Sequence, residues 1–423
     1  MKNLSDTIME VFKFGGASVK DSKSVQNVGR IIGSNSNVII VISAMGKTTN
    51  ALENIVNAYS NNESYQDYLD KIKLFHAEII DELFPNTEHS IRPTFETIFS
   101  YLDRYLTSSH NNDYDQIYDQ VVPIGELLSS KILSAYLTDI GIENEWLDIR
   151  KILRTDNYFR KANVDYKASK IELQNSITTG IYVTQGFIGG TNNNLMTTLG
   201  REGSDYSAAL ISNMIEAESL TVWKDVSGVL NADPRYFNDP KKLDQISYRE
   251  AIELSFYGAS IIHPKTIKPL QNLNISLYVK SFVSPESTGT IINENTENDD
   301  LLPIYIYKPN QLLLSLSRKD YGFLEEEQLS EVFRILHEHK LEVNIMQNSA
   351  INFSICLDNE KNRIEKVIPI FQENYRVLYN TNLELLTIRH YKDSGAEELT
   401  KGHEIILEQK TRNTLKFLLR NLD

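Results

Sequence analysis

The sequence predicts an α/β protein, a three-layer αβα sandwich followed by a smaller α+β region. Over the first two thirds of the 423 residues, short apolar runs alternate with segments of helical periodicity, the pattern of parallel strands joined by helices. After an acidic, asparagine-rich stretch, the alternation restarts as β-α-β-β-α-β, which is typical of the ferredoxin-like topology. We therefore expect a large domain at 1–293, a linker at 294–303 and a smaller region at 304–423.

The first strand–helix–strand unit begins close to the N-terminus. Val11–Phe14 reads as a short strand, and residues 21–33 have apolar side chains at helical spacing, with a polar start and a terminal glycine. Val38–Ile42 is continuously apolar, as expected for a strand that is covered on both faces. A helix is expected at Asn50–Tyr59, so the two strands should pair in parallel.

Residues 62–118 interrupt this pattern, because they are polar, helical in periodicity and rich in tyrosine. We interpret them as a mainly helical insertion. The α/β pattern resumes with a helix at 125–137 and with strands within 180–190, 219–229 and 275–280. In the smaller region, strands are expected at 311–317, 343–348, 351–357 and 376–390, and helices at 329–337 and 361–373. The remaining tail is too short for a second complete unit.

Composition excludes several classes of protein. The net charge of −14 and the absence of a long basic cluster disfavour partners such as nucleic acids or anionic membranes. A single cysteine, Cys356, excludes a disulfide framework and a cysteine-based zinc site, and we expect it to be a partly buried structural residue. His337 and His339 lack the spacing of a zincin pair, so no protein metal site is predicted. Without a signal peptide or a long apolar run, a soluble cytoplasmic protein is expected.

Lys13 is the first residue that could carry chemistry. It lies at the end of the first strand and is followed by Gly15 and Gly16. Glycines allow backbone N–H groups to approach an anion, and ligands of open α/β sheets bind beyond the carboxyl ends of strands, so phosphate is the natural ligand. A lysine that snorkels from a strand end is an equally consistent interpretation. Neither the P-loop nor the dinucleotide-binding fingerprint is present.

A second candidate anion site is TTLGREGSDYSAALI at 197–211. A glycine-containing loop leads into a helix N-terminus, and Arg201 would add a guanidinium fork suited to a carboxylate. A plain helix cap by Ser204 or Asp205 is the alternative, but it leaves Arg201 without a role. Glu126 begins another helix, and beside Arg201 it would complete a site for a zwitterion.

Two strand-end loops complete the candidates. Asp225 follows a strand in VWKDVSGVLNADPR and could orient a ligand or a metal-bound water, or it could belong to a loop built from turn-forming residues. SAMGKTTN at 43–50 is rich in small and hydroxyl residues.

Together these segments resemble the aspartate kinase family. KFGGASV, SAMGKTTN, GELLSS, TQGFIGG, TLGREGSD, KDVSGVLNADPR and SYREAIELSFYGASIIHPKT occur in the family order over residues 9–293. The C-terminal β-α-β-β-α-β unit resembles the ACT regulatory domains of these kinases. The resemblance implies an amino-acid-kinase-like sandwich with an ACT region, and phosphorylation of L-aspartate by ATP to 4-phospho-L-aspartate, the first step toward lysine, threonine and methionine.

The resemblance also assigns roles to residues. Lys13 would stabilise the transferring phosphoryl group, and Asp205 would orient Lys13 or the substrate. Mg²⁺ would be held mainly by ATP oxygens and water. Residues matching the aspartate pocket are Ser43, Thr49, Glu126, Phe187 and Arg201. Residues matching the nucleotide site are Lys13, Gly15, Gly16, Ser18, Asp225, Asp233 and Arg235, together with Lys224, Leu230 and Ser260, at which this chain departs from the family.

The chain departs from the family at several positions, three of which change charge. Ala17 replaces the usual threonine, Glu202 a glycine and Leu230 a tyrosine, whereas a nucleotide-site lysine is lost at Ser260 and one is gained at Lys224. We hypothesise that Lys224 substitutes for the lost cation.

The family implies an amino-acid effector, threonine or lysine, bound in the ACT region, and a homodimer or higher oligomer formed through it. The candidate effector residues are Ser317, Asp320, Gly322, Asn344 and Ser349. Asn344 and Ser349-Ala350 stand where acidic and Ser-Glu residues are usual, which disfavours tight binding of lysine. A dehydrogenase module is not expected.

Two alternatives remain. Another enzyme of the same fold would use glutamate, acetylglutamate or a nucleoside monophosphate as acceptor, although Glu126 would repel a phosphate. A non-catalytic amino-acid sensor would have lost its nucleotide site at Leu230 and Ser260.

Overall fold

The computed structural model describes residues 9–33, 35–108, 113–259, 262–320, 322–392 and 395–422. The chain forms two compact units, which are described separately. Unit 1 contains Met1–Val229, Lys242–Ile252 and Ser260–Asp299, and unit 2 contains Leu230–Lys241, Glu253–Ala259 and Asp300–Asp423.

Unit 1 is built around an eight-stranded sheet whose strands pair in parallel except where β10 runs antiparallel to β9. The central strands are apolar on both faces, because helices cover both sides, and β2 is buried along its whole length. The spatial order is β3 (Glu145–Trp146), β4 (Ile181–Gln185), β2 (Val38–Ile42), β1 (Glu10–Phe14), β7 (Ser219–Lys224), β9 (Ser276–Ser281), β10 (Thr290–Asn293) and β8 (Gln245–Ser247).

Helices form the outer layers of unit 1. Side chains alternate along β1, so that Lys13 faces α8 while Phe12 faces α1. The predicted three-layer α/β sandwich is therefore confirmed. The helices of the α1 face are α1 (Ser22–Ile32) and α6 (Ile124–Asp139); those of the α8 face are α7 (Tyr166–Ser176), α8 (Gly203–Ile215) and α10 (Pro264–Gln271). The unit also contains η2 (Gly16–Val19), α2 (Thr48–Ser60), η3 (Ile149–Lys151) and the start of α9 (Tyr248–Tyr257).

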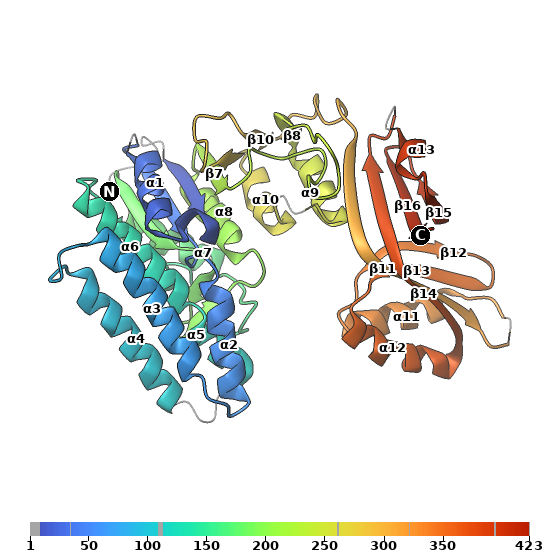
Figure 1. Cartoon of the computed structure of the whole chain (residues 1–423), viewed down its shortest axis with the longest axis horizontal. Helices are drawn as coiled ribbons and strands as arrows, with labels where there is room; N and C mark the ends of the chain where they lie inside the picture. Colours follow the sequence, from blue (N-terminus) through green and yellow to red (C-terminus); the bar gives the residue numbers. More distant parts are fainter. Residues whose placement is uncertain are drawn as a thin grey trace. The chain divides into compact units, whose positions relative to one another are not determined.

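The predicted helical insertion consists of three helices that lie beside α2 and α6 (Figure 1). Its amphipathic character explains its position, because Phe95, Phe99 and Leu102 are buried on one face of the second helix. The helices are α3 (Gln66–Leu83), α4 (Ile91–Ser108) and α5 (Tyr114–Val121), and α5 also packs against a small hairpin, β5 (Ile188–Gly190) with β6 (Met196–Thr198).

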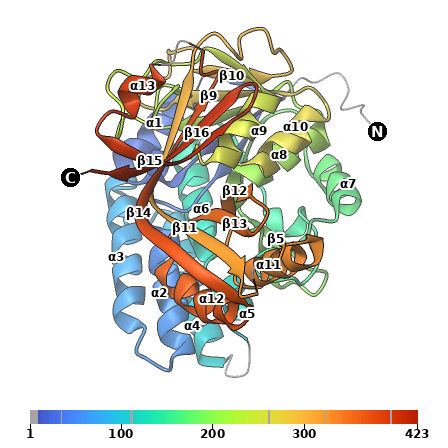
Figure 2. The ribbon, with the colours of Figure 1, turned by 90° about the vertical axis from the view of Figure 1, so that its right-hand side faces the viewer.

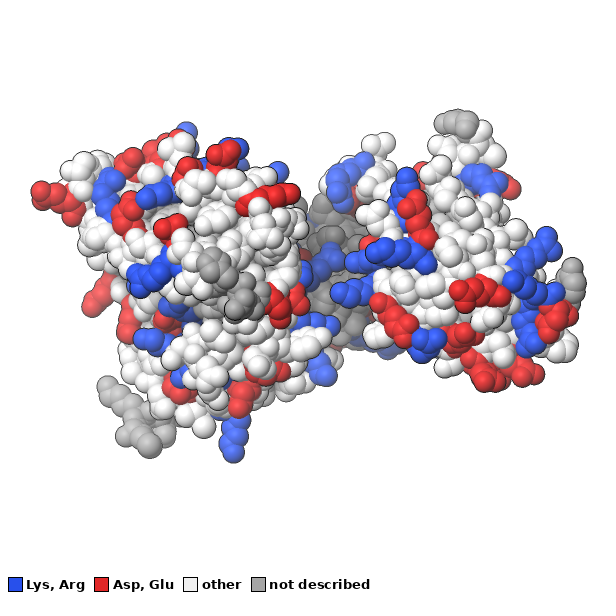
Figure 3. Space-filling view, turned by 90° about the horizontal axis from the view of Figure 1, so that it is seen from below, with Lys and Arg blue, Asp and Glu red and all other residues white. Residues whose placement is uncertain are grey.

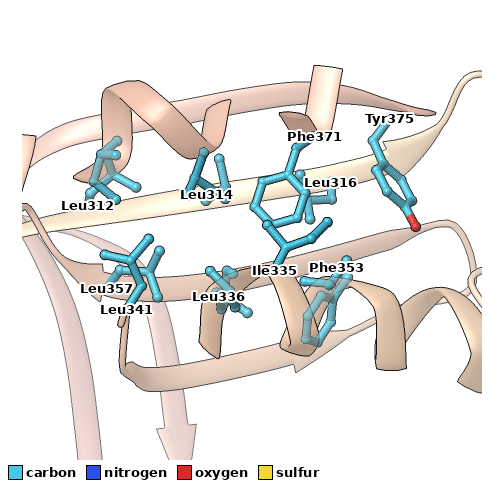
Figure 4. Close-up of a cluster of buried hydrophobic side chains, with 14 of the residues drawn as sticks. Leu312, Leu314, Leu316, Ile335, Leu336, Leu341, Phe353, Leu357, Phe371 and Tyr375 are labelled. Atoms are coloured by element: carbon cyan, nitrogen blue, oxygen red, sulfur yellow. The ribbon is translucent and has the colours of Figure 1, made fainter. Parts of the chain in front are cut away.

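Unit 2 is a six-stranded antiparallel sheet with two helices on one face. The first four strands and two helices follow the predicted ferredoxin-like order, and Figure 2 shows the long strands β11 and β14 side by side. Leucines 312, 314 and 316 of β11 pack beneath the helices in a cluster with Phe353 and Phe371 (Figure 4). The elements are β11 (Ile304–Arg318), α11 (Glu326–Glu338), β12 (Val343–Asn348), β13 (Asn352–Asp358), α12 (Lys361–Asn374), β14 (Tyr375–Arg389), α13 (Ala396–Leu399), β15 (His403–Lys410) and β16 (Thr414–Asn421).

Some details differ from the expectations. The segment 180–190 is two strands, because Phe187 takes a positive φ of 71° and breaks the run. Cys356 is fully rather than partly buried, since it packs in an apolar cluster with Leu313, Ile345 and Leu385. Among the described residues, no helix is long and apolar enough to cross a membrane. Figure 3 shows acidic and basic side chains interspersed on the face of each unit that it presents.

Candidate active site

A cavity of about 450 Å³ lies at the carboxyl end of the sheet in unit 1, where ligands of open α/β sheets bind. Strand ends β1, β2 and β4 and the N-termini of α2, α6 and α8 all contribute side chains. All five residues predicted for the aspartate pocket and both predicted catalytic residues line this cavity: Ser43, Thr49, Glu126, Phe187 and Arg201, with Lys13 and Asp205.

Lys13 and Asp205 form a buried ion pair in this cavity. The Lys13 Nζ lies 2.7 Å from Asp205 Oδ1, and their side chains are only 10% and 2% exposed. Burial alone would raise the pKa of Asp205, but the positive charges of Lys13 and Lys224 outweigh it and hold that pKa below its usual range. The carboxylate therefore stays ionised and fixes the ammonium group at the strand end.

Glu126 is a buried carboxyl group with one oxygen left free. Its Oε1 accepts a hydrogen bond from the Ala44 N–H at 3.2 Å, whereas Oε2 is buried with no hydrogen-bond partner in the described structure. Burial raises the pKa of Glu126 to about 8, against the opposing effects of the Ala44 N–H and the Lys13 charge. A cationic group of a ligand in the cavity would satisfy Oε2 and favour the ionised form.

Close packing brings Glu126 to this position. A Cβ at Gly125 would lie 2.7 Å from the Ala44 Cβ, so the first turn of α6 approaches the loop after β2 only because residue 125 is glycine.

The N-terminus of α8 forms the opposite wall. A Cβ at Gly203 would lie 2.6 Å from the Phe187 ring, so the helix start and the aromatic side chain are in tight contact. Arg201 is exposed just before the helix, and the N-terminal end of the helix dipole adds positive potential for an anion. The charged residues of the cavity are Lys13, Glu53, Glu126, Arg160, Arg201, Glu202 and Asp205. Among them, Glu126 suits the ammonium group of a small zwitterion, Arg201 its carboxylate and Lys13 a second negative group.

Comparison with known proteins identifies the family. The model of the amino acid kinase family matches residues 9–281. Lysine-sensitive aspartokinase 3 of Escherichia coli (strain K12) is 32% identical over 358 residues, covering 82% of this chain and 78% of its own. The chain belongs to the aspartokinase family.

Solved structures agree with this membership. E. coli aspartokinase III in complex with aspartate and ADP superimposes with a TM-score of 0.80 at 28% identity, over 97% of this chain and 96% of its own. The same protein in complex with lysine and aspartate gives a TM-score of 0.80, over 97% and 95% of the two chains, at 28% identity. The predicted resemblance is confirmed, and the chain is an amino acid kinase.

Some aspartokinase relatives are longer. The maize chloroplastic bifunctional aspartokinase/homoserine dehydrogenase 1 is 31% identical over 69% of this chain, and the match spans 33% of the maize protein. The chain thus corresponds to about a third of that relative.

Gly15, Gly16 and Ser18, which were predicted to lie along the phosphates of ATP, form the turn after β1. Gly16 is fixed by packing, since a Cβ there would lie 2.8 Å from the Ala44 carbonyl oxygen. The Ser18 N–H donates to the Gly15 carbonyl, and its buried hydroxyl donates to the Trp223 carbonyl at 3.4 Å. These bonds hold the turn against the end of β7, whose last residue is Lys224 and which is followed by the exposed Asp225.

The remaining nucleotide-site predictions fall in unit 2 or outside the described residues. Leu230, Asp233 and Arg235 belong to unit 2, where the exposed Arg235 guanidinium forms a two-pronged ion pair with Asp233 at 2.6 Å. Ser260 lies outside the described residues.

Sequence reasoning missed three residues of the cavity, Glu53, Tyr118 and Arg160. The other lining residues, Thr198, Gly200, Glu202, Gly203 and Ser204, belong to the segment 197–211 that was predicted as an anion site. Asp119, just behind the cavity wall, is fully buried and accepts hydrogen bonds from the Arg160 N–H and from the N–H and hydroxyl of Thr198. Burial raises the pKa of Asp119 to about 6 despite these bonds. No motif marks Glu53, Tyr118, Asp119 or Arg160, because they come from helices and a loop that meet only in the fold.

The predicted effector residues are all in unit 2. Ser317 of β11 pairs with Asn352, and the Ser349 hydroxyl donates to the Asn352 carbonyl, so both serines lie next to Asn352 at the start of β13. The Asp320 carboxylate accepts hydrogen bonds from Arg318 and the Gly322 N–H. Asn344 lies about 17 Å along the strand from Ser349, and its amide is engaged by Gln311, Asp358 and Lys308.

Proposed function

We propose that this protein is an aspartate kinase that transfers the γ-phosphoryl group of ATP to the side-chain carboxylate of L-aspartate, giving ADP and 4-phospho-L-aspartate. The observation that supports it most strongly is the pairing, in one cavity, of a buried carboxyl group with a free oxygen, Glu126, and a helix-terminal arginine, Arg201. An amino acid offers an ammonium group to the first and a carboxylate to the second.

The substrate would lie between these groups and Lys13. The α-amino group contacts Glu126 Oε2 and the α-carboxylate contacts Arg201, which leaves the side-chain carboxylate directed toward Lys13. One oxygen of that carboxylate attacks the γ-phosphorus, and the bond from phosphorus to the β–γ bridging oxygen breaks, releasing ADP. The carboxylate is already a nucleophile, so catalysis rests on positioning and on charge stabilisation by Lys13, which Asp205 holds in place.

The nucleotide is expected beside the turn after β1. Gly15, Gly16 and Ser18 would lie along the phosphates, and Lys224 would add a cation. The described residues contain no group of three or more histidine, cysteine or acidic side chains that could hold a metal ion. Mg²⁺ is expected to arrive with ATP, bound mainly by phosphate oxygens and water, and it would neutralise phosphate charge.

Regulation and assembly are part of the proposal. The lysine-sensitive E. coli relative supports an amino-acid effector in unit 2, and the ferredoxin-like sheet has open edges at β12 and β15 through which two copies could pair. Asn344 carries no charge and its amide is already hydrogen-bonded, which favours threonine over lysine as the effector.

An assay with several acceptors tests the reaction. With ATP and Mg²⁺, we expect aspartate to support ADP formation and to yield a product that hydroxylamine traps as a hydroxamate, as an acyl phosphate does. Turnover with glutamate or acetylglutamate but not aspartate would identify another enzyme of the fold. Binding of amino acids without ADP formation from any acceptor would instead support the sensor alternative. Adding lysine or threonine to the same assay tests the effector.

A further inference from the structure

Three residues of the active-site cavity have no role in the reaction described above. Glu53 from α2, Tyr118 from α5 and Arg160 from the loop before α7 line the same cavity as Lys13 and Arg201. They come from three separate parts of the chain, yet they contact one another. We call these three residues the end wall.

The end wall is held by a chain of polar contacts. The Tyr118 hydroxyl donates to Glu53 Oε1 at 2.6 Å, and the Arg160 guanidinium lies 4.6 Å from the centre of the Tyr118 ring. Arg160 also pairs with Asp115 at 3.0 Å. Each side chain is therefore restrained by its neighbours, and the wall has a defined surface rather than a set of free rotamers.

The backbone beneath Arg160 is fixed as well. Its φ is +64°, a region that residues other than glycine rarely adopt and that costs about 1–2 kcal/mol. Its N–H donates to the buried Asp119, which also binds Thr198. Position 160 bears this backbone cost with an arginine rather than a glycine, which is consistent with a function of the Arg160 side chain in the cavity.

The position of the end wall follows from its neighbours. Glu53 is one helical turn beyond Thr49 on α2, so both side chains lie on one face of the helix. The Arg160 carbonyl oxygen would lie 3.2 Å from a Cβ at Gly200, the residue before Arg201. The end wall therefore closes the cavity beside Thr49 and Arg201, whereas Lys13 lies at the strand end.

We propose that the end wall sets the length of the acceptor, so that the cavity accepts a four-carbon amino dicarboxylate and rejects one with an additional methylene. This inference rests on the proposed function. With the reacting carboxylate at Lys13, the α-carbon groups of a longer acceptor must shift toward Tyr118 and Glu53. The wall prevents this shift, so the longer acceptor loses its alignment for transfer. One methylene is worth about 10–200-fold in discrimination.

The experiment compares aspartate with glutamate, in the full-length protein, for two alanine variants of α5. Tyr118→Ala removes the centre of the end wall. Tyr114→Ala is the matched control, because Tyr114 lies one turn earlier, stacks on the same arginine at 5.4 Å and bonds Asn57 outside the cavity. Both changes remove an aromatic ring from the contact with Arg160, but only the first enlarges the cavity.

We expect Tyr118→Ala to lower the ratio of kcat/KM for aspartate to that for glutamate at least tenfold, and Tyr114→Ala to leave it within twofold. Tyr118→Phe, which keeps the ring but loses the bond to Glu53, should retain most of the selectivity. Arg160→Gly relieves the left-handed backbone and should relax selectivity in a folded protein. Dissociation constants for the two acids, measured by calorimetry, give the same comparison without turnover.

An unchanged ratio in both Tyr118→Ala and Arg160→Gly, with aspartate still a substrate, overturns the inference and leaves the proposed function intact. An equal change in Tyr118→Ala and Tyr114→Ala overturns it too, because the effect would then arise from α5 rather than from the cavity. If the unmodified protein turns over neither acid, the proposed function has failed, and the inference fails with it.

Discussion

The ammonium group of Lys13 lies 2.7 Å from the carboxylate of Asp205, and both side chains are almost completely buried. Breaking such a pair by removing one partner costs about 3–5 kcal/mol, because the other charge stays buried without compensation. The pair therefore contributes to folding as well as to the proposed chemistry, and a test of catalysis must separate the two.

We expect Lys13→Met to lower kcat by about 100-fold or more, since it removes the charge that faces the transferring phosphoryl group. The variant should also be less stable in urea unfolding. The double variant Lys13→Met/Asp205→Leu removes both charges, so it should regain much of the lost stability while remaining inactive. If the double variant recovers activity along with stability, Lys13 has only a structural role.

Glu126 predicts how aspartate affinity depends on pH. Burial raises its pKa to about 8, so the group is mostly protonated in the free protein near neutral pH. A bound ammonium group favours the ionised form, and binding should therefore release a proton. As pH rises from 6 toward 8, affinity should increase by up to about tenfold per unit.

Calorimetry in buffers of different ionisation enthalpy would measure the released proton and the dissociation constant together. Glu126→Gln should bind aspartate weakly, with no such pH dependence below 8. The assignment is wrong if the glutamine variant shows the same slope as the unmodified protein.

Lys224 provides a test of the nucleotide site. Its charge lowers the pKa of Asp205, so it acts within the same electrostatic environment as Lys13. If it substitutes for the cation lost at Ser260, Lys224→Ala should raise the KM for ATP about tenfold or more and change that for aspartate little. Lys280→Ala is a useful control, because Lys280 lies on the next strand in register with Trp223 and faces the α1 side of the sheet. Equal KM values for ATP in Lys224→Ala and the unmodified protein would exclude the substitution.

The sequence allowed prediction of the site residues that sit at the ends of strands or, like Glu126 and Arg201, at helix starts within recognisable motifs. Lys13, Ser43 and Asp225 follow apolar runs whose carboxyl ends share one edge of a parallel sheet, so their neighbourhood follows from topology. Glu53, Tyr118 and Arg160 could not be found in this way. They come together because α2, α5 and a loop pack against one another, and their spacing along the chain carries no trace of that packing.

The fold, like the site, was predictable from the sequence only in part. Apolar periodicity marks the strands and helices, which is why both sheets could be predicted. The break of 180–190 at Phe187 depends on a single left-handed residue next to Gly186, where a Cβ would lie 2.7 Å from the Ser204 side chain. Likewise, 230–241 and 253–259 pack with unit 2 through tertiary contacts such as the Tyr305 N–H to the Asn231 carbonyl at 2.7 Å, and local sequence does not encode such contacts.

His76 predicts a loss of stability in acid. It is completely buried in α3, its Nδ1 bonds the Ile72 carbonyl at 2.8 Å, and Nε2 has no partner in the described structure. Burial lowers the pKa of His76 from 6.5 to about 4, although the bond to Ile72 acts in the opposite direction. Between these values the unfolded chain binds a proton that the folded chain does not, so His76 makes stability fall as pH falls from 6.5 to 4, by about 1.4 kcal/mol per unit.

Glu126 has the opposite effect on stability. Between pH 4.5 and 8 the folded chain binds a proton that the unfolded chain does not, so Glu126 makes stability rise as pH falls through this range. Comparison of variants separates the two effects. We expect His76→Leu to unfold in urea at a higher midpoint than the unmodified protein at pH 5, and the difference to shrink by pH 7.5. His339→Leu is the matched control, because His339 bonds the Ile335 carbonyl in the same way at 2.9 Å but is only partly buried, so water can hydrate the ring. A pH-independent difference between His76→Leu and the unmodified protein would show that packing, rather than protonation of the buried ring, determines the effect.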